Sequence, residues 1–265
     1  QNMKLLAEVE GVDICLSGHT HYRLSKPVMQ GKTLVIESGC HGSFLGHLEV
    51  TVADKSVISF QHTLVEMEEN LLPDASTAAL VAAALNPFRE YLSQKVGATT
   101  TLLDRSTSLE STMDNLLLES LLAATGAELA FSNGWRYGAP IPPGDITLND
   151  LYNIIPMNPE IRTVTLRGEE IMTMLEENLE RTFSGNAYQQ LGGYVKRALG
   201  LRAFIKIEAP AGNRIQQLFI NDMPLLLSKD YQVAYVTEQG VPAKIGQNHQ
   251  GSGIKAIEAL QRYLT

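Results

Sequence analysis

The chain has few cysteines and no excess of positive charge. Its two cysteines among 265 residues do not by themselves indicate a disulfide. The formal net charge of −8 argues against non-specific nucleic-acid binding, which needs a basic surface. No uninterrupted apolar run approaches about 18 residues, so we expect no membrane span. What is present, a hydrophobic content of 44%, is typical of a globular protein with a sizeable core.

Composition changes twice along the chain and predicts three parts. Residues 1–65 are rich in strand-like runs. Residues 66–97 begin with an acidic stretch and continue with alanine and leucine, which favour a helix that starts near Asp74 and breaks at Pro87. We therefore expect one domain at 1–65, a connector at 66–97 and a second domain at 98–265.

The last part mixes helices and strands without regular alternation. This order favours an α+β fold over a doubly wound parallel sheet. The expected strands cover 99–104, 127–132, 161–166, 202–208, 214–220 and 230–236, and the expected helices cover 110–125, 147–153, 168–181 and 253–263.

Two histidines two residues apart form the first informative motif. Residues 12–16 read as a buried strand, and Gly18 then ends it before His19 and His21. On extended backbone, side chains at i and i+2 point to one side, which suits two nitrogen ligands on one metal ion or on an adjacent pair. The alternative is a pair of ordinary surface or core histidines, and His41 in the following Gly-rich turn is expected to be structural.

A second motif follows the expected strand at 127–132. Asn133 and Arg136 flank a glycine turn at the end of this strand. A guanidinium offers a planar fork to phosphate or sulfate, and backbone N–H groups near glycine can add to it. The motif therefore indicates anion recognition, and the alternative is a structural turn with a surface arginine.

The histidine loop resembles the last metal-binding loop of calcineurin-like metallophosphoesterases, in the form found in the 5'-nucleotidase family. Residues 31–50 look like the closing strands of that catalytic domain, and residues from about 99 onward look like the family's C-terminal substrate-binding domain. The runs at 141–147 and 166–171 match further family motifs. The resemblance implies that residues 1–65 are a C-terminal remnant of the catalytic domain, with its first strands and other metal ligands expected to be absent from this chain.

The resemblance also implies substrate contacts from the C-terminal domain. Arg136 and Asn133 match the family's substrate arginine and asparagine, Arg105 lies near a second substrate arginine, and Asn158 belongs to a turn that normally carries a base-stacking phenylalanine. Met157 stands at that phenylalanine position, and no aromatic residue occupies the second stacking position near Glu238. These replacements argue against adenosine-type specificity.

Residues 188–197 resemble a segment of the thiosulfohydrolase of bacterial thiosulfate oxidation, which releases sulfate from a cysteine on a carrier protein. Arg197 matches an arginine of that segment, and Tyr194 replaces its aspartate. Three hypotheses follow for the full-length protein: a dimetal phosphoesterase acting on a nucleotide-like or other anionic substrate, a thiosulfohydrolase-like enzyme with a sulfur-carrier partner, and an anion-binding module without catalysis.

The family implies two divalent ions, such as Mn²⁺ or Zn²⁺, and a periplasmic or secreted location. In this chain only His19 and His21 are expected metal ligands. Each ion takes about four to six donors, so we expect this chain alone to bind metal weakly or not at all and to hydrolyse no phosphate ester.

Overall fold

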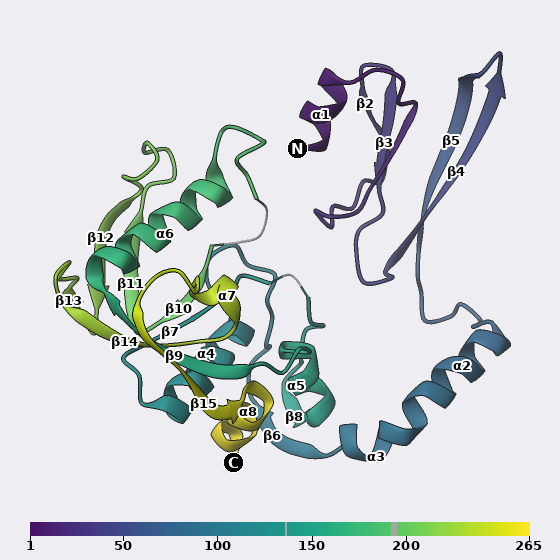
Figure 1. Ribbon diagram of the computed structural model, residues 1–265. Coiled ribbons are helices and arrows are strands. Elements are labelled where there is room, and N and C mark those ends of the chain that lie inside the picture. Colours follow the sequence, from purple (N-terminus) through teal and green to yellow (C-terminus); the bar gives the residue numbers. More distant parts are fainter. Residues whose placement is uncertain (136, 192–194) are drawn as a thin grey trace. The chain divides into compact units, whose positions relative to one another are not determined.

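The computed structural model describes residues 1–135, 137–191 and 195–265. The chain divides into two compact units, residues 1–82 and 83–265 (Figure 1). Each unit is considered by itself below. The three-part division expected from composition stays a proposal, since the connector helix α2 (Ala75–Leu85) lies across this boundary.

The N-terminal unit contains a short helix, a small sheet and a long hairpin. Strand β3 is central in the sheet, parallel to β1 and antiparallel to β2, and all five of its residues are buried. The elements are α1 (Asn2–Glu8), β1 (Ile14–Ser17), β2 (Val28–Gln30), β3 (Thr33–Glu37), β4 (Phe44–Ala53) and β5 (Ser56–Glu66).

Strands β4 and β5 pair only with each other among the described strands, in antiparallel register from Phe44–Glu66 to Ala53–Ser56. Asp54 and Lys55 close the hairpin, and both have positive φ. This conformation is favoured in two-residue turns because it matches the right-handed twist of the two strands.

Helix α2 begins and ends where its sequence predicts. The Asp74 carboxylate accepts hydrogen bonds from Ser76 Oγ (2.6 Å) and Thr77 N (2.8 Å), which lower the pKa of Asp74 to about 2 and cap the helix. Pro87 then lies in a 3₁₀ turn (Asn86–Phe88), because its ring cannot continue an α-helix. Helix α3 (Arg89–Leu92) follows.

The C-terminal unit is built on a five-stranded sheet of order β10-β7-β14-β9-β15 (Figure 1). Strands β7 and β14 are parallel neighbours, and the other pairs are antiparallel. These strands are β7 (Leu129–Ser132), β9 (Glu160–Arg167), β10 (Arg197–Leu199), β14 (Asp230–Tyr235) and β15 (Gln247–Lys255).

Two smaller sheets and a set of helices complete this unit. One sheet pairs β6 (Lys95–Thr99) with β8 (Gly144–Thr147), and the other has the order β11 (Leu201–Ile205), β12 (Ile215–Ile220), β13 (Met223–Pro224). The helices are α4 (Thr112–Thr125), α5 (Leu148–Ile154), α6 (Gly168–Phe183), α7 (Thr237–Gly240) and α8 (Ala256–Leu264).

The five-stranded sheet separates two hydrophobic cores. Along β7, Ala130 packs in one core with α4, α5 and α8, while Leu129 and Phe131 pack in the other with α6 and β12. Strand β14 divides its residues in the same way, as alternation along a strand requires. The α+β class expected from the sequence is confirmed.

Several elements differ from expectation, among them β8, β13 and α7, which the sequence did not predict. The first strand of the C-terminal unit, β6, ends at Thr99 instead of starting there. Strands β10 and β15 were not expected, because β10 has three residues and β15 contains two glycines. A Cβ at Gly251 would lie 2.4 Å from the Glu160 carboxylate, so a larger residue there would displace that side chain. Among the described residues, no helix has both the length and the apolar character needed to cross a bilayer.

Candidate functional site

The Gly-His-Thr-His loop follows β1, as the sequence predicts, and a buried carboxylate anchors it. Glu37, at the end of β3 and 4% exposed, accepts hydrogen bonds from Thr20 Oγ1 (2.7 Å), Tyr22 N (2.9 Å) and Ser17 Oγ (2.9 Å). Sequence reasoning missed this role, because Glu37 becomes the neighbour of the loop only through the parallel pairing of β1 with β3.

The charge of Glu37 is favoured by this setting. Burial raises the pKa of its carboxyl, but the hydrogen bonds from Thr20, Tyr22 and Ser17 together outweigh burial and leave the pKa below its ordinary value. The carboxylate form therefore orders the loop that carries the two histidines.

The loop continues beside a second loop, residues 38–42. Gly39 N donates to Tyr22 O (2.9 Å), Leu24 N donates to Glu37 O (3.0 Å), and Arg23 pairs with Ser38 in an isolated bridge. The Arg23 guanidinium also lies 4.6 Å from the Phe44 ring centroid, next to the second loop. These contacts fix the backbones of the two loops side by side.

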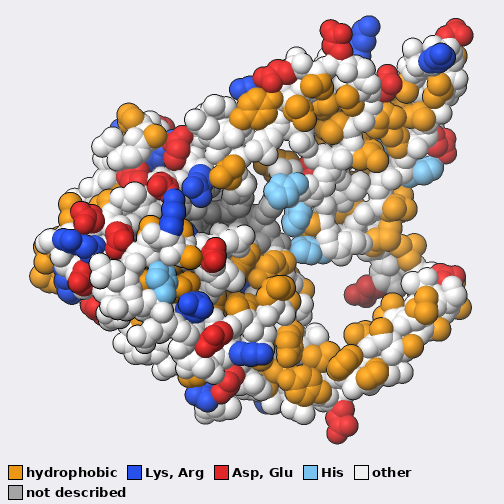
Figure 2. Space-filling view, in the orientation of Figure 1, with side chains coloured by type: hydrophobic (Ala, Val, Ile, Leu, Met, Phe, Trp, Pro, Cys, Tyr) orange, Lys and Arg blue, Asp and Glu red, His pale blue; other side chains and the backbone are white. Residues whose placement is uncertain are grey.

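This pairing brings His21, Cys40 and His41 together. One possible ligand atom from each lies within 4.8 Å of the others, and the His21 and His41 rings meet edge to face at 5.6 Å. His19 is exposed and is not a member of this group. Figure 2 shows histidine side chains gathered on one stretch of surface. The sequence predicted His21 as a metal ligand and His41 as a structural residue, and Cys40 and His41 lie in the Gly-Cys-His-Gly run after β3.

Two imidazoles and a thiol are a suitable donor set for a divalent ion. Imidazole and thiolate both bind Zn²⁺, and His41 is exposed, which leaves an entry path for an ion. The prediction of weak metal binding rested on His19 and His21 alone, and the structure places two further donor residues beside His21.

In the C-terminal unit, candidate residues gather where β7 and β14 end. Because these strands are parallel, their carboxyl ends lie at the same sheet edge, a usual place for ligands. Gln239 in α7 accepts hydrogen bonds from Trp135 Nε1 (3.1 Å) and Asn133 Nδ2 (3.4 Å), and Trp135 stacks on Tyr137. The chain segments that follow the two strands are thus linked at this edge.

A buried ionic cluster lies next to Trp135 and Tyr137. The Asp114 carboxylate, fully buried at the start of α4, accepts from Arg105 Nε (2.9 Å) and Arg197 Nε (2.8 Å). The two arginine side chains are 3% and 2% exposed. Two positive charges against one negative charge give these three side chains a net positive charge.

The remaining arginine contacts join distant parts of the chain. Arg105 donates to the carbonyls of Tyr137 (3.0 Å) and Ile154 (2.9 Å), and Arg197 donates to those of Thr107 (2.7 Å) and Leu109. The Arg105 guanidinium also faces the rings of Tyr137 (5.1 Å) and Trp135 (5.7 Å). Substrate contact by either arginine stays a prediction, and the structure shows that both hold the site together.

Tyr137 is buried beside Arg105 and Asp114 of this cluster. Burial raises the pKa of its hydroxyl to about 12, and the nearby charges of Arg105 and Asp114 act in opposite directions. The phenol is therefore neutral at physiological pH and acts as an aromatic surface.

The other expected substrate residues differ in their placement. Asn158, two residues before β9, has φ 42°, and its Oδ1 accepts from Ile257 N (3.0 Å) at the start of α8. Its neighbour Met157 is 81% exposed. Arg136, the expected substrate arginine, lies outside the described residues, as does Tyr194.

Lys196 is a further residue of this region that sequence reasoning missed. Its buried Nζ donates to the carbonyls of Gly240 (2.7 Å) and Gln239 and so holds the end of α7 in place. Burial, with a smaller contribution from the charge of Arg181, lowers the pKa of Lys196 to about 8 from its ordinary value of 10.5.

This shift predicts a pH dependence of stability. Between about pH 8 and 10.5, Lys196 is protonated in the unfolded chain and neutral in the folded chain, so the free energy of unfolding rises with pH. The difference in unfolding free energy between the native protein and Lys196→Met should rise by up to ~1.4 kcal/mol per pH unit in this window. Urea unfolding at a series of pH values measures it, and exposed Lys206→Met controls for the loss of one charge. A constant difference across the window would contradict the prediction.

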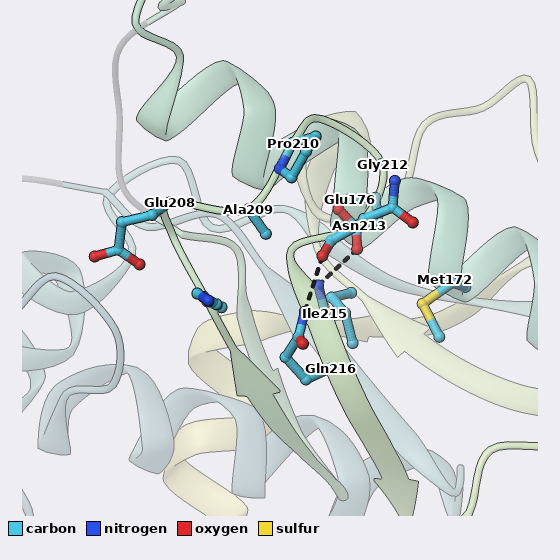
Figure 3. A pocket seen from close by; sticks show the side chains of 10 residues that line it. Met172, Glu176, Glu208, Ala209, Pro210, Gly212, Asn213, Ile215 and Gln216 are labelled. Carbon is cyan, nitrogen blue, oxygen red and sulfur yellow. Dashed lines mark hydrogen bonds between the residues drawn. The ribbon is translucent and has the colours of Figure 1, made fainter.

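A further depression of the C-terminal unit lies away from these residues. A cavity of about 590 Å³ opens between α6 and the loop joining β11 to β12 (Figure 3). Glu176 lines it, but its carboxylate already accepts from Ile215 N (2.6 Å) and Arg214 N (3.0 Å). None of the expected site residues lines this cavity.

Two solved structures share the fold of this chain. The chain superposes over 99% of its length on the sulfate thiohydrolase SoxB of Thermus thermophilus (TM-score 0.90, 28% identity, 49% of that chain). It also superposes over 99% of its length on a 5'-nucleotidase precursor from the same organism (TM-score 0.86, 58% of that chain), where 23% identity shows the fold alone.

Curated relatives include the trifunctional nucleotide phosphoesterase YfkN of Bacillus subtilis (26% identity, 81% of this chain, 16% of that protein). The snake venom 5'-nucleotidase of Naja atra is 21% identical over 88% of this chain. The chain spans only 16% and 51% of these two relatives. Residues 95–237, more than half of the chain, match the 5'-nucleotidase C-terminal domain, and the protein belongs to that family.

Proposed function

We propose that this chain is part of a metal-dependent hydrolase that acts on an ester bond of a small anionic substrate, and that the C-terminal unit binds this substrate. The observation that carries the proposal is the sheet edge at the ends of β7 and β14. There Asn133 and Trp135 are linked through Gln239, beside a buried cluster with a net positive charge. Such a cluster attracts an anion, and its fixed hydrogen bonds hold the loops in one geometry.

The N-terminal unit supplies metal ligands to this function. His19 and His21 lie on a loop that the Glu37 carboxylate orders, and neutral imidazole is a common ligand of divalent ions. Divalent ions, when bound, polarise the substrate and lower the pKa of a bound water. The remaining ligands of a two-ion centre belong to the longer protein expected from the family, so activity is proposed for that protein.

A phosphate ester is the first candidate substrate class. The relatives named above are a nucleotide phosphoesterase and a 5'-nucleotidase, and the latter is a venom protein. By the same likeness we propose an exported, periplasmic or secreted location.

A thiosulfohydrolase-like activity is the second candidate. It is favoured by the 28% identity to the sulfate thiohydrolase SoxB over 99% of this chain, and by Arg197 in the segment that resembles that branch. This activity implies a sulfur-carrier protein as partner. Gly192, Gly193 and Tyr194 of the same segment lie outside the described residues.

Turnover by the longer protein separates these possibilities. The purified protein with Mn²⁺ or Zn²⁺ is given p-nitrophenyl phosphate, AMP, or a peptide whose cysteine carries a bound thiosulfonate (Cys–S–S–SO₃⁻). Release of phosphate from an ester supports the phosphoesterase, and release of sulfate from the peptide supports the second candidate. Binding of phosphate or sulfate without any turnover would leave an anion-binding module and contradict the hydrolase proposal.

AMP is expected to bind weakly. Exposed Met157 and Glu238 stand where the family stacks two aromatic rings on the base, and each ring contributes roughly 1–3 kcal/mol. Calorimetry with the longer protein should therefore show an AMP affinity weaker than low-micromolar. The double variant Met157→Phe, Glu238→Phe should bind AMP at least about tenfold more tightly, with p-nitrophenyl phosphate as the control ligand. Low-micromolar binding of AMP by the native protein would contradict this prediction.

A further inference from the structure

We infer that Gln239 is a positioning residue of the proposed substrate site, which fixes the direction of the Asn133 side chain, and that Lys196 holds Gln239 in place. The inference rests on the proposed function, because it takes the ends of β7 and β14 as the edge that meets the substrate. It adds to that function two residues that act through Asn133.

The indole of Trp135 decides how the Gln239 amide is oriented. An indole N–H can only donate, so the Gln239 atom that lies 3.1 Å from Trp135 Nε1 must be the carbonyl oxygen. The same oxygen lies 3.4 Å from the amide of Asn133, and a second carbonyl oxygen could not bond to it. The Asn133 atom that faces Gln239 is therefore Nδ2, which leaves Oδ1 and one N–H of Asn133 for a substrate.

The indole itself has little freedom. Trp135 is half-buried against the core of α4, α5 and α8, and its ring stacks on that of Tyr137 with 5.6 Å between the centroids. The Arg105 guanidinium lies 5.7 Å from the centroid of the Trp135 ring. Because these contacts fix the indole, its N–H points to one place, and Gln239 must be held there to accept from it.

Lys196 supplies this hold. Helix α7 has only four residues, too few for its own hydrogen bonds to fix Gln239. Lys196 Nζ donates to the carbonyls of Gln239 and Gly240. The backbone of Lys196 is itself anchored to α6, where its N–H donates to Asn178 Oδ1 (2.7 Å). Gly240 also packs closely on β7, since a Cβ there would lie 3.0 Å from Phe131 O.

A strained residue at the start of α7 supports this role. Thr237 has φ 61°, which is a genuine outlier for a β-branched residue. Its Oγ1 is buried and has no hydrogen-bond partner among the described residues. Such a conformation persists only where the surrounding contacts enforce it, and it is commonest at functional sites. The hydrogen bonds from Lys196 to Gln239 and Gly240 are contacts of this kind.

The single tryptophan makes the positioning measurable. In the chain 1–265, the Trp135 indole gives one N–H signal in the NMR spectrum, and a hydrogen bond slows the exchange of this proton with solvent. Gln239→Leu should speed the exchange by about two- to tenfold, because one neutral hydrogen bond is lost. Gln239→Glu should exchange as the native chain does, since a carboxylate oxygen also accepts. Exposed Gln250→Leu on β15 is the control and should leave the signal unchanged.

Turnover by the longer protein tests the effect on substrate binding. Gln239→Leu should raise KM for p-nitrophenyl phosphate about two- to tenfold with kcat nearly unchanged, because the substrate and its transition state lose the same contact. Lys196→Met should change KM in the same direction. The double variant should be no worse than Gln239→Leu alone, because Lys196 acts through Gln239.

Three results would overturn the inference: a native exchange rate in Gln239→Leu, a native KM in that variant, or effects of Lys196→Met and Gln239→Leu that add in the double variant. A longer protein without any turnover would instead contradict the proposed function. The exchange measurement would then still decide whether Gln239 holds Trp135.

Discussion

Asp114→Asn should destabilise the C-terminal unit by about 3–5 kcal/mol, because it leaves two buried guanidinium groups without the carboxylate that they share. The side chain also accepts from Ser111 Oγ (2.7 Å), the cap of α4, so the start of this helix loosens as well. Urea unfolding followed by circular dichroism measures the change, and the thermal midpoint should fall by roughly 2–4 °C per kcal/mol for a unit of this size.

Asp145→Asn is the matched control. Its carboxylate also pairs with a cation, Lys95, at 2.7 Å, but both side chains are exposed. An exposed pair contributes at most about 1 kcal/mol, so this variant should unfold almost as the native protein does. Equal losses in the two variants would show that the buried cluster does not stabilise the fold in the way described.

Arg136→Ala should lower kcat/KM of the longer enzyme by about ten- to a hundredfold while the protein still folds. The expectation rests on the sequence motif that follows β7, since this residue lies outside the described part of the chain. A charge-assisted hydrogen bond to an anion contributes roughly 1.5–3 kcal/mol, which corresponds to the stated range. Arg136→Lys should restore only part of the activity, because an ammonium group cannot form the bidentate fork.

Arg167→Ala controls for the loss of a positive charge. Arg167 is an exposed arginine at the end of β9, where it pairs with Glu169 at 3.3 Å. Its removal should leave turnover unchanged. An Arg136→Ala protein that keeps full activity but unfolds several degrees earlier would make Arg136 a structural residue and would displace the proposed substrate site.

Much of the fold was predictable because its signals are local. Helix α4 is capped at its start by Ser111, whose hydroxyl accepts from Asp114 N, and at its end by Gly126 in the left-handed conformation. Both are signals that a sequence displays directly. Strand β10 was missed for the opposite reason: its three residues are a strand only because they pair with β7, which lies far earlier in the sequence.

The candidate sites follow the same rule. Residue type and spacing indicated His21 and the arginines, since those properties belong to the sequence. The nearness of His21 to Cys40 and His41 depends on hydrogen bonds between loops that flank β2 and β3. Likewise, no local pattern shows that Asp114 receives both Arg105 and Arg197, from 9 and 83 residues away.

The long sequence separation between Asp114 and Arg197 affects the order in which the buried cluster can form. Arg105 and Asp114 are close along the chain, so they can meet while α4 forms, whereas Arg197 must close a far longer loop. Until it does, the carbonyls of Thr107 and Leu109 lack their guanidinium partner, and β10 has not joined β7. The anion-binding edge proposed above is therefore complete only after the 83-residue separation between Asp114 and Arg197 has been closed.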